Sequence, residues 1–414
     1  MGSRSVCMIG LGYIGLPTAA VLASRGVNVV GVDINPRAVE AISRGTVHIV
    51  EPGLDIAVKG AVATGKLRAT FKPEPADTFI VAVPTPFTDN HKPDLSYIQS
   101  ASQALATVVK KGDLVVLEST SPVGTTERMC AWIAEQRPDL KMPEYNGEPG
   151  DIFVAHCPER VLPGQVLREL VENDRIIGGM TRACAERAKE LYEIFVAGEC
   201  VVTDARTAEM CKLTENSFRD VNIAFANELS MLCERFEVNV WELIAMANRH
   251  PRVKILKPGP GVGGHCIAVD PWFIVDSAPD IARLIRTARN VNDDKARHVY
   301  DLIAKACAGK RRPRIACFGL AFKANIDDLR ESPAVEIVQW LADNREYEVL
   351  AVEPHISELP KALADHPNVK LTTASRALQE AEVLVLLVDH NQFKGIDKNA
   401  IHGRPVIDTR GAWR

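Results

Sequence analysis

The stretch SVCMIGLGYIGLPTAAVLASRGVNVVGVDIN, residues 5–35, has the pattern of an apolar strand, a tight turn, a helix and a second apolar strand. Gly10, Gly12 and Gly15 give the spacing G-x-G-x-x-G directly after the first strand. In this spacing the first glycine forms the turn, the second lets a pyrophosphate approach the backbone, and the third allows close packing of helix on strand. Asp33 ends the second strand, where an acid can bond ribose hydroxyls. The stretch therefore predicts a dinucleotide-binding Rossmann domain.

The acid at residue 33 also indicates which dinucleotide is bound. A carboxylate there repels a 2′-phosphate, so NAD is favoured over NADP. We expect Tyr13 and Ile14, inside the glycine motif, to belong to the same NAD site. Two later apolar runs, TFIVAVPTPF and DLVVLESTSPVGTTE, pass into polar loops at their carboxyl ends, where a doubly wound sheet binds its ligand. Candidates there for the cofactor and nicotinamide side, with helix capping as their alternative role, are Thr85, Thr120 and Thr126.

Length and composition limit the classes of protein. A chain of 414 residues with 46% hydrophobic and 25% charged residues is too long for one core and predicts two or three domains. The net charge of -4 shows no basic bias, so neither nucleic acid nor an anionic membrane is an expected partner. The longest apolar run is too short to span a bilayer, and the start of the chain leaves no room for a signal peptide. Ten scattered cysteines with no C-x-x-C pair indicate a reducing, cytoplasmic location and no metal site.

The last hundred residues repeat the alternation of strand and helix. RIACFGLAF, EVLAVEP and EVLVLLVDH have the pattern of strands, and SPAVEIVQWLADN has that of a helix. Only Gly319 remains of the glycine motif, and Lys323 and Arg330 follow it in the loop. Cations in place of glycines predict a second nucleotide-type site that binds phosphate through charge, with a solvated basic loop as the alternative.

The middle of the chain, residues 206–250, has helical periodicity without Pro or Gly, and predicts a long connecting helix followed by a second helix. Apolar residues fall on one side of the first helix: Met210, Leu213, Val221 and Phe225. Lys212, Asn216 and Arg219 form a polar stripe on the other side. A solvated face is the usual explanation, but Asn is a poor helix former and the charges form no compensating pairs, so we expect a functional face.

The segment GPGVGGHCIAVDPW, residues 259–272, places Cys266 and Asp270 four residues apart behind a glycine-rich loop. A buried, structural thiol is the ordinary explanation of a lone cysteine. A reactive thiol is the alternative, and the choice between them depends on the rest of the chain.

Six stretches together resemble the UDP-glucose/GDP-mannose 6-dehydrogenase family along essentially the whole chain: GLGYIGLP, ESTSPVGTTE, CPERVLPG, KLTENSFRDVNIAFANEL, GVGGHCIAVDP and FGLAFKANIDDLRESPA. The resemblance implies an α/β fold with two Rossmann-like doubly wound domains joined by a long central helix and a helical dimerisation region. The expected domains are an NAD-binding domain over residues 1–200, a central helical dimerisation domain over 201–305, and a UDP-sugar-binding Rossmann-like domain over 306–414. It also implies a homodimer.

The resemblance further implies a four-electron oxidation of the primary alcohol at sugar C6 to a carboxylate, with two NAD and one water. Cys266 is then the nucleophile that forms a thiohemiacetal with the aldehyde and carries the thioester that water hydrolyses. We expect Gly261, Gly263 and Gly264 to keep side chains away, so that C6 can approach the sulfur. A catalytically silent nucleotide sensor is the alternative from another class, and the presence of Cys266 and Lys212 argues against it.

The family implies roles for further residues. Lys212 is the expected base or oxyanion stabiliser at C6, and Asn216 holds the developing alkoxide or a water. Asp270 is expected to orient water and Lys212, while Thr120 and Glu159 hold the catalytic water or assist proton transfer. The expected substrate contacts are Arg160 and Val161 at the sugar, Arg219, His250 and Arg252 at sugar or phosphate, Gly263 at the loop, Lys323 at the UDP end and Arg410 on the substrate side. Arg330 is expected at the NAD phosphates, and Arg252 across a dimer interface.

Two departures from the family pattern bear on the substrate. His265, Ala268 and Val269 stand where UDP-glucose enzymes usually carry a Ser-Cys-Phe-Pro-Lys-Asp type of run, which argues against plain UDP-glucose. The expected substrate is UDP-N-acetyl-D-mannosamine and the expected product its uronate, for bacterial surface polysaccharide of the enterobacterial common antigen type. The same reaction on UDP-N-acetylglucosamine or UDP-glucose is the alternative. Residues 163–165 are Pro-Gly-Gln where the family often has Ala-Glu-Gly, so a role for that acid stays open.

Overall fold

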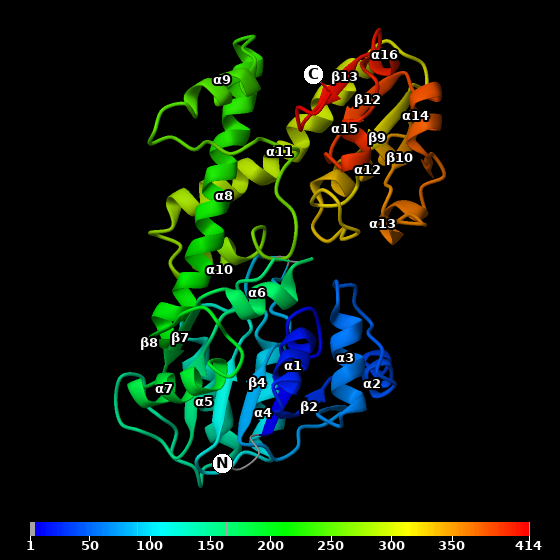
Figure 1. The fold of residues 1–414 in the computed structure, drawn as a ribbon. Coiled ribbons are helices and arrows are strands. Elements are labelled where there is room, and N and C mark those ends of the chain that lie inside the picture. The colour runs from blue at the N-terminus through cyan, green and yellow to red at the C-terminus, as the bar shows by residue number, and fades with distance from the viewer. Residues whose placement is uncertain (1–4, 89, 163, 414) are drawn as a thin grey trace. The chain divides into compact units, whose positions relative to one another are not determined.

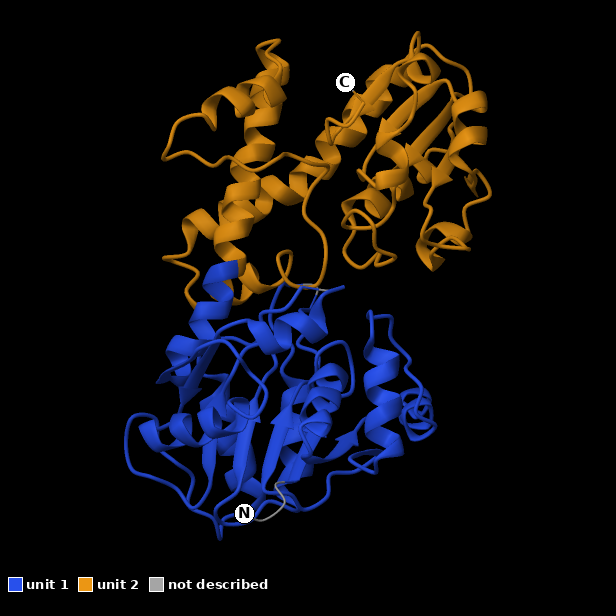
Figure 2. Cartoon of the chain, viewed as in Figure 1, with its two compact units in different colours: residues 1–215 blue, residues 216–414 orange. Residues whose placement is uncertain are grey.

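The computed structural model describes residues 5–88, 90–162 and 164–413 and contains two compact units, residues 1–215 and 216–414 (Figures 1 and 2). Each unit has its own sheet, and the boundary between the units falls inside helix α8 (Ala205–Arg235). The predicted α/β class, with two Rossmann-like sheets and a long joining helix, is confirmed.

Unit 1 is built on an eight-stranded sheet in the order β3-β2-β1-β4-β5-β6-β7-β8, in which only the pair β6–β7 is antiparallel. The strands are β1 (Ser5–Ile9), β2 (Asn28–Val32), β3 (Leu67–Thr70), β4 (Thr78–Val81), β5 (Leu114–Leu117), β6 (Phe153–His156), β7 (Arg175–Gly179) and β8 (Cys200–Asp204). The order reverses between β1 and β4, and a doubly wound sheet binds its ligand at the carboxyl ends of strands at such a point.

Helices cover the sheet of unit 1, and alternate residues of its strands enter two separate cores. Val6 and Met8 of β1 belong to one core, and Cys7 and Ile9 to the other. This alternation follows from the two-residue period of a strand that is buried on both faces. The helices before α8 are α1 (Gly15–Ser24), α2 (Pro36–Ser43), α3 (Leu54–Ala63), α4 (Ser96–Ala106), α5 (Thr125–Gln136), α6 (Val166–Glu172) and α7 (Arg182–Tyr192).

Unit 2 is built on a five-stranded sheet in the order β11-β10-β9-β12-β13, with all pairs parallel. The strands are β9 (Arg314–Phe318), β10 (Glu348–Val352), β11 (Val369–Leu371), β12 (Val383–Leu386) and β13 (Val406–Asp408). The helices after α8 are α9 (Val240–Ala247), α10 (Asp270–Ser277), α11 (Arg283–Cys307), α12 (Pro333–Asp343), α13 (Lys361–Ala364), α14 (Ala374–Glu380), α15 (Asn391–Lys394) and α16 (Lys398–Ile401). The first strand of this unit is again flanked by the second and fourth, as in unit 1.

Helix α8 is a single helix of 31 residues, as its periodicity predicts, and its carboxyl-terminal part packs with α11 through a buried polar network. Arg289 of α11 donates to Asp220 of α8 at 2.6 Å, and Asn292 donates to the same carboxylate at 2.8 Å. Asn227 donates to Asn292 at 2.9 Å. Most of these buried groups are hydrogen-bonded to one another, as is usual for buried polar groups, although Asp220 Oδ2 and Arg289 Nε have no hydrogen-bond partner among the described residues.

The burial of the two sides of α8 differs from that expected for a simple amphipathic helix. Of the apolar residues on the side predicted above, Leu213 is buried, but Met210 is 40% and Phe225 is 55% exposed. On the polar side Asn216 is buried and Arg219 is exposed. The polar stripe is therefore not a uniformly solvated face. No helix among the described residues combines the length and apolar character needed to cross a bilayer.

Candidate active site

The glycine turn after β1 fits a dinucleotide. Gly10 has a φ of 94°, and a Cβ there would overlap the carbonyl oxygen of Ala82. A Cβ at Gly15 would overlap the carbonyl oxygen of Gly10, whereas nothing lies within 4 Å of a Cβ at Gly12. Chain packing thus requires glycine at the first and third positions, and the second leaves open space where a pyrophosphate could approach the α1 N-terminus.

Asp33 is held beside this turn at the end of β2. Its Oδ2 accepts a hydrogen bond from the Leu11 amide at 2.9 Å, and its Oδ1 accepts one from the Asn35 amide at 2.8 Å. The side chain is only partly buried, so the carboxylate is both oriented and accessible. Tyr13 is 41% exposed and Ile14 is half-buried in the turn before α1.

Thr85 and Thr120 come together at the carboxyl ends of β4 and β5. The Thr85 hydroxyl donates to the Thr120 carbonyl oxygen at 2.5 Å, and both residues are half-buried. Thr126 differs, because it is fully buried in the first turn of α5 and its hydroxyl donates to Glu209 of α8 at 2.6 Å. The amide of Gly124 donates to the same carboxylate at 2.6 Å.

Glu209 is a residue that sequence reasoning missed. It lies 83 residues from Thr126 along the chain and accepts from the amide and the hydroxyl of that threonine. Burial raises the pKa of Glu209, and the hydrogen bonds from Thr126 oppose this rise. The carboxylate fixes the amino-terminal turn of α5, a position where helices favour an acid.

Glu159 belongs to a buried cluster of ionisable groups. Its Oε2 accepts from the Arg175 guanidinium at 2.7 Å, and its Oε1 accepts from the Arg160 amide at 2.6 Å. Glu118 lies in the same cluster and accepts from the Tyr192 hydroxyl at 3.1 Å. Burial, and then the charge of Glu159, raise the pKa of Glu118 to about 8. Glu159 is thus paired inside unit 1, with the amide of the next residue and with Arg175 of β7.

The segment that follows Glu159 is anchored at several points. The Arg160 guanidinium pairs with Glu215 at 2.7 Å and donates to the Asp174 carbonyl oxygen at 3.2 Å, and Val161 is half-buried against the first core. Glu51 accepts from the amides of Gly164 and Val166, both at 2.8 Å. An acid from a distant segment therefore holds this loop. Pro163, one of the residues that depart from the family pattern, lies outside the described residues.

Cys266, Asp270 and Asn216 lie together in unit 2. The amide of Asp270, the first residue of α10, donates to the Cys266 carbonyl oxygen at 2.8 Å. The Asn216 side-chain amide donates to Asp270 Oδ2, and both side chains are buried. Cys266 is only partly buried, and its Sγ lies 3.0 Å from His265 Nδ1. Sequence reasoning treated His265 only as a mark of specificity, although an imidazole beside a thiol can promote the thiolate.

The glycines of this loop pack against another loop. A Cβ at Gly263 would overlap the Glu331 carbonyl oxygen, and one at Gly264 would lie 2.8 Å from the Phe322 ring. A Cβ at Gly261 would lie 3.0 Å from Pro333, and the Gly264 amide donates to the Arg330 carbonyl oxygen at 3.1 Å. These positions therefore require glycine because the loop packs closely on the β9–α12 loop. We did not expect this requirement from the sequence.

A small cavity of about 30 Å³ adjoins the same loop in unit 2. Its lining includes Lys323 and Arg410, two of the predicted substrate residues, together with Gly261. Arg410 Nε donates to Asp389 at 3.0 Å, and the exposed Arg330 pairs with Asp328 at 2.5 Å. The lining thus combines a lysine and an arginine with apolar side chains at the carboxyl ends of parallel strands, which is where such a sheet binds nucleotides.

The remaining predicted residues lie on helix α8 and after α9. Lys212 is half-buried in unit 1, one helical turn before Asn216, which belongs to unit 2. Arg219 of α8, and His250 and Arg252 after α9, are exposed. The His250 ring accepts from the Arg252 amide at 3.4 Å.

Comparisons with known proteins agree with this architecture. Models of the UDP-glucose/GDP-mannose dehydrogenase family match in three parts: the NAD binding domain at residues 4–196, the central domain at 206–294 and the UDP binding domain at 316–414. The chain is 66% identical over 410 residues to an NDP-N-acetyl-D-galactosaminuronic acid dehydrogenase of Ralstonia nicotianae, covering 99% of this chain and 96% of the relative. It is 60% identical over 422 residues to a UDP-N-acetyl-D-mannosamine dehydrogenase of Yersinia pestis, covering all of both chains.

A solved structure shares the fold along nearly the whole length. The UDP-D-ManNAc dehydrogenase from Pyrococcus horikoshii is 38% identical and superimposes with a TM-score of 0.87, over 99% of this chain and 96% of that chain. From its sequence, its two nucleotide-type sheets and these likenesses, the chain belongs to the UDP-glucose/GDP-mannose dehydrogenase family, whose members join an NAD binding domain to a UDP binding domain.

Proposed function

We propose that the protein oxidises the C6 alcohol of UDP-N-acetyl-D-mannosamine to the carboxylate through a covalent intermediate on Cys266. The observation that carries the proposal is the partly exposed Cys266 thiol, which lies beside His265 and one turn before an Asp270 carboxylate that Asn216 holds. A thiol that served only packing would be buried, as eight of the other nine cysteines of the chain are.

The chemistry of the chain's own groups is as follows. Bound NAD serves as the hydride acceptor in each of the two oxidations. After the first, the Cys266 thiolate adds to the aldehyde carbon and forms a thiohemiacetal, whose C–H bond supplies the second hydride. Water then cleaves the thioester: its oxygen bonds to the acyl carbon as the C–S bond breaks, one of its protons goes to the Cys266 sulfur, and the acid releases the other proton on becoming the carboxylate. In this proposal Lys212 and Asn216 stabilise oxygen at C6, Asp270 orients water, and Thr120 and Glu159 hold water or move its proton.

The identity of the sugar rests on the relatives and on the loop around the thiol. Relatives at 60% identity bear the name UDP-N-acetyl-D-mannosamine dehydrogenase, and His265, Ala268 and Val269 argue against plain UDP-glucose. A second candidate is an N-acetyl-galactosamine nucleotide, because the relative at 66% identity is named for N-acetyl-D-galactosaminuronic acid. Both candidates carry an N-acetyl group at C2, so the proposal of an N-acetylated sugar does not depend on the choice between them.

A panel of nucleotide sugars tests this proposal. NADH formation should be measured with UDP-N-acetyl-D-mannosamine, UDP-N-acetylgalactosamine, UDP-N-acetylglucosamine and UDP-glucose. We expect the highest kcat/KM on the first, with two NADH per sugar. A higher value on the galactosamine nucleotide would establish the second candidate. Equal values on UDP-glucose would refute selection for an N-acetyl group.

We further propose that the active form is a homodimer that uses α8. Phe218, Phe225 and Leu232 repeat every seven residues on one face of the helix, and they are 68%, 55% and 43% exposed. A stripe of this spacing is typical of helices that pack on a partner. Light scattering should give twice the mass of 45.3 kDa, and Phe225→Asp should give monomers. A monomeric unmodified protein with full activity would refute the dimer.

The cellular setting stays a prediction. None of the ten cysteines, all of which are among the described residues, forms a disulfide, which supports a reducing, cytoplasmic location. The uronate product suits a bacterial surface polysaccharide of the enterobacterial common antigen type, as the family resemblance implies.

A further inference from the structure

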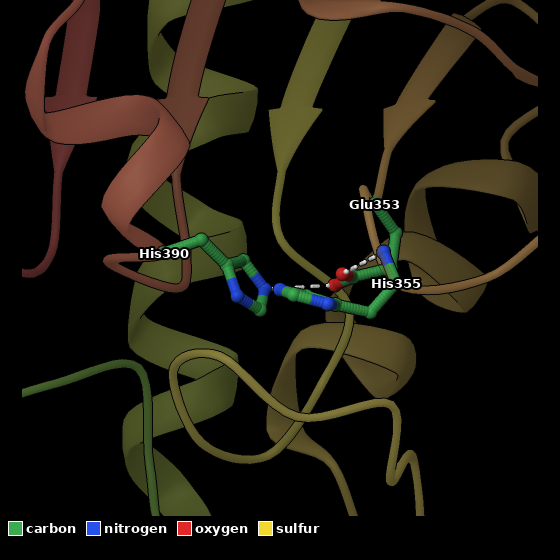
Figure 3. Close-up of side chains that lie close together, drawn as sticks. All are labelled: Glu353, His355 and His390. Atoms are coloured by element: carbon green, nitrogen blue, oxygen red, sulfur yellow. Dashed lines mark hydrogen bonds and ion pairs between the residues drawn. The ribbon is translucent and has the colours of Figure 1, made fainter.

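Glu353, His355 and His390 form a cluster of metal-ligand side chains in unit 2 (Figure 3). Glu353 follows β10 and His390 follows β12, two strands that flank β9 in the sheet. The candidate ligand atoms lie within 4.8 Å of one another. Glu353 and His390 are almost completely buried. Two of the three side chains therefore belong to the protein interior. Their hydrogen bonds determine whether the cluster can bind a metal.

The proton positions on His390 follow from its two partners. Its Nδ1 lies 2.9 Å from the backbone amide of Asn325, which can only donate, so Nδ1 accepts. Its Nε2 lies 3.0 Å from Glu353 Oε2 and must therefore carry the proton that it donates to the carboxylate. Both ring nitrogens of this neutral imidazole are in use.

This tautomer excludes His390 as a metal ligand. A histidine binds a metal through an unprotonated nitrogen, and its other nitrogen normally donates a hydrogen bond. Here Nε2, which faces the cluster, is protonated, and Nδ1 accepts. Glu353 Oε2 also accepts from the amides of Leu320 and Ala321, at 2.7 and 3.1 Å. What remains for a metal is His355 Nε2 and one lone pair of the carboxylate, fewer ligands than a protein zinc site uses.

Glu353 holds the position in unit 2 that Asp33, the expected ribose-binding acid, holds in unit 1, but Glu353 bonds to groups of the protein itself. Asp33 follows the second strand of its sheet and accepts from the Leu11 amide beside Gly10. Glu353 follows the second strand of the other sheet and accepts from the Leu320 amide beside Gly319. Asp33 is partly exposed, whereas Glu353 is 4% exposed and also accepts from His390. The second acid therefore bonds to loops instead of a ribose.

The loop that His390 holds forms one wall of the cavity described above. Asn325 has a φ of 63°, a conformation that Asn tolerates better than most residues. Its side-chain oxygen accepts from the Asn391 amide at 2.9 Å, so the two segments are joined by a pair of reciprocal hydrogen bonds. Residues 321–324, directly before Asn325, line the cavity and include Lys323.

We infer that Glu353, His390 and the Asn325 amide form a relay that positions the Lys323 loop for binding the UDP part of the substrate. The inference rests on the proposed function, because it assigns the cavity to the nucleotide. In the relay the carboxylate fixes the imidazole tautomer, and the imidazole fixes the backbone two residues after Lys323. His390 is a positioning residue and touches neither substrate nor cofactor.

Two substitutions separate the two arms of the relay. In His390→Asn the side-chain oxygen stands near the Nδ1 position and can still accept from Asn325. In His390→Gln the side-chain amide can still donate to Glu353, but the acceptor for Asn325 is lost. We expect His390→Gln to raise the Kd for UDP, measured by calorimetry, by about fivefold, because one intramolecular hydrogen bond is lost. The KM for the UDP-sugar should rise likewise, while kcat at saturation and the KM for NAD stay unchanged. His390→Asn should bind UDP as the unmodified protein does.

Two further histidines provide controls. His402→Gln changes an exposed histidine of the same unit and should leave UDP binding unchanged. His355→Gln should also leave it unchanged, because His355 bonds to Glu353 through its backbone amide, at 3.2 Å. Equal losses in His355→Gln and His390→Gln, together with a stoichiometric metal in the purified protein, would overturn the relay in favour of a metal site. Equal UDP binding by His390→Gln and the unmodified protein would also overturn it, and so would equal losses in His390→Gln and His390→Asn.

A measurement on the unmodified protein covers the case in which the variants do not fold. In protein labelled with ¹⁵N-histidine, NMR should show His390 protonated at Nε2 and not at Nδ1. The opposite tautomer would refute the relay. If none of the UDP-sugars is oxidised, the proposed function fails, but UDP binding and the tautomer still test the relay.

Discussion

The side-chain amide of Asn216 donates a hydrogen bond of 2.5 Å to Asp270 Oδ2, and this bond joins helix α8 to the first residue of α10. Asp270 in turn donates its backbone amide to the carbonyl oxygen of Cys266. Asn216→Ala should lower kcat by about a hundredfold, because the proposed function places this oriented polar group at the reacting carbon. The measurement is NADH formation at saturating substrate and NAD, with the thermal midpoint recorded beside it.

Asn222→Ala is the matched control on the same helix. Among the described residues, the Asn222 side chain donates to the Phe218 carbonyl oxygen within α8, at 2.7 Å. This variant should keep its kcat. If Asn216→Ala retained its kcat and lost only thermal stability, the bond to Asp270 would be structural.

Removal of the thiol should separate the two oxidations. Cys266→Ala should lower steady turnover by more than about a hundredfold, the typical cost of losing one positioned catalytic group. In Cys266→Ser the weaker nucleophile should give one slow NADH per site and a sugar-nucleotide ester, which intact-protein mass spectrometry detects. Cys211→Ala removes the other half-buried thiol and should be active. Two NADH per sugar from Cys266→Ala at the normal rate would show that the thiol is structural.

The anchored carboxylate beside the glycine turn should set the choice of cofactor. Asp33→Asn keeps an acceptor for the Leu11 amide but loses the charge that repels a 2′-phosphate. The ratio of kcat/KM for NAD to that for NADP should fall by about tenfold, the effect of roughly one unfavourable charge contact. Comparable values of kcat/KM for the two cofactors in the unmodified protein would contradict the assignment.

Burial of Glu118 should make stability depend on pH. Burial and the charge of Glu159 raise the pKa of Glu118 from 4.5 to about 8, so the folded state holds a proton that the unfolded state releases above pH 4.5. Stability is therefore lost as pH rises from about 4.5 to about 8. Glu118→Gln removes this loss, so its advantage over the unmodified protein should grow with pH, to at most about 5 kcal/mol at pH 8.

Urea midpoints at pH 5 and pH 8 check this prediction. Glu135→Gln, on the exposed side of α5, is the control for loss of a carboxylate. An advantage of Glu118→Gln that is the same at both pH values would show that Glu118 is ionised in the folded protein.

The sequence was sufficient where a requirement is local. The turn at Gly10, the acid at the end of β2 and the 31-residue helix α8 depend on neighbours within a few turns of chain, so spacing and periodicity predicted them. The backbone bond from Asp270 to Cys266 is local in the same sense, because one turn of chain separates the two residues.

Contacts between distant segments could not be predicted in this way. Glu209 bonds to Thr126 across 83 residues, and Glu118 bonds to Tyr192 across 74. Glu209 lies outside the six family stretches, and Glu118 opens one of them without an assigned role; a helical or strand pattern gives no information on which side chain will contact which. The packing of Gly263 on the carbonyl oxygen of Glu331 was missed likewise, since only the folded loop makes it visible.

Gly10 and Gly319 end the first strand of their sheets with φ values of 94° and 95°. A Cβ at Gly10 would overlap Ala82, after β4, and one at Gly319 would overlap Val388, after β12. The dinucleotide fingerprint thus combines two requirements: its first and third glycines are needed for packing of the chain, and its second leaves open space for the ligand. A search for the whole G-x-G-x-x-G spacing would find the first sheet of this chain and miss the second. A search for an apolar strand followed by a single glycine of positive φ would find both sheets.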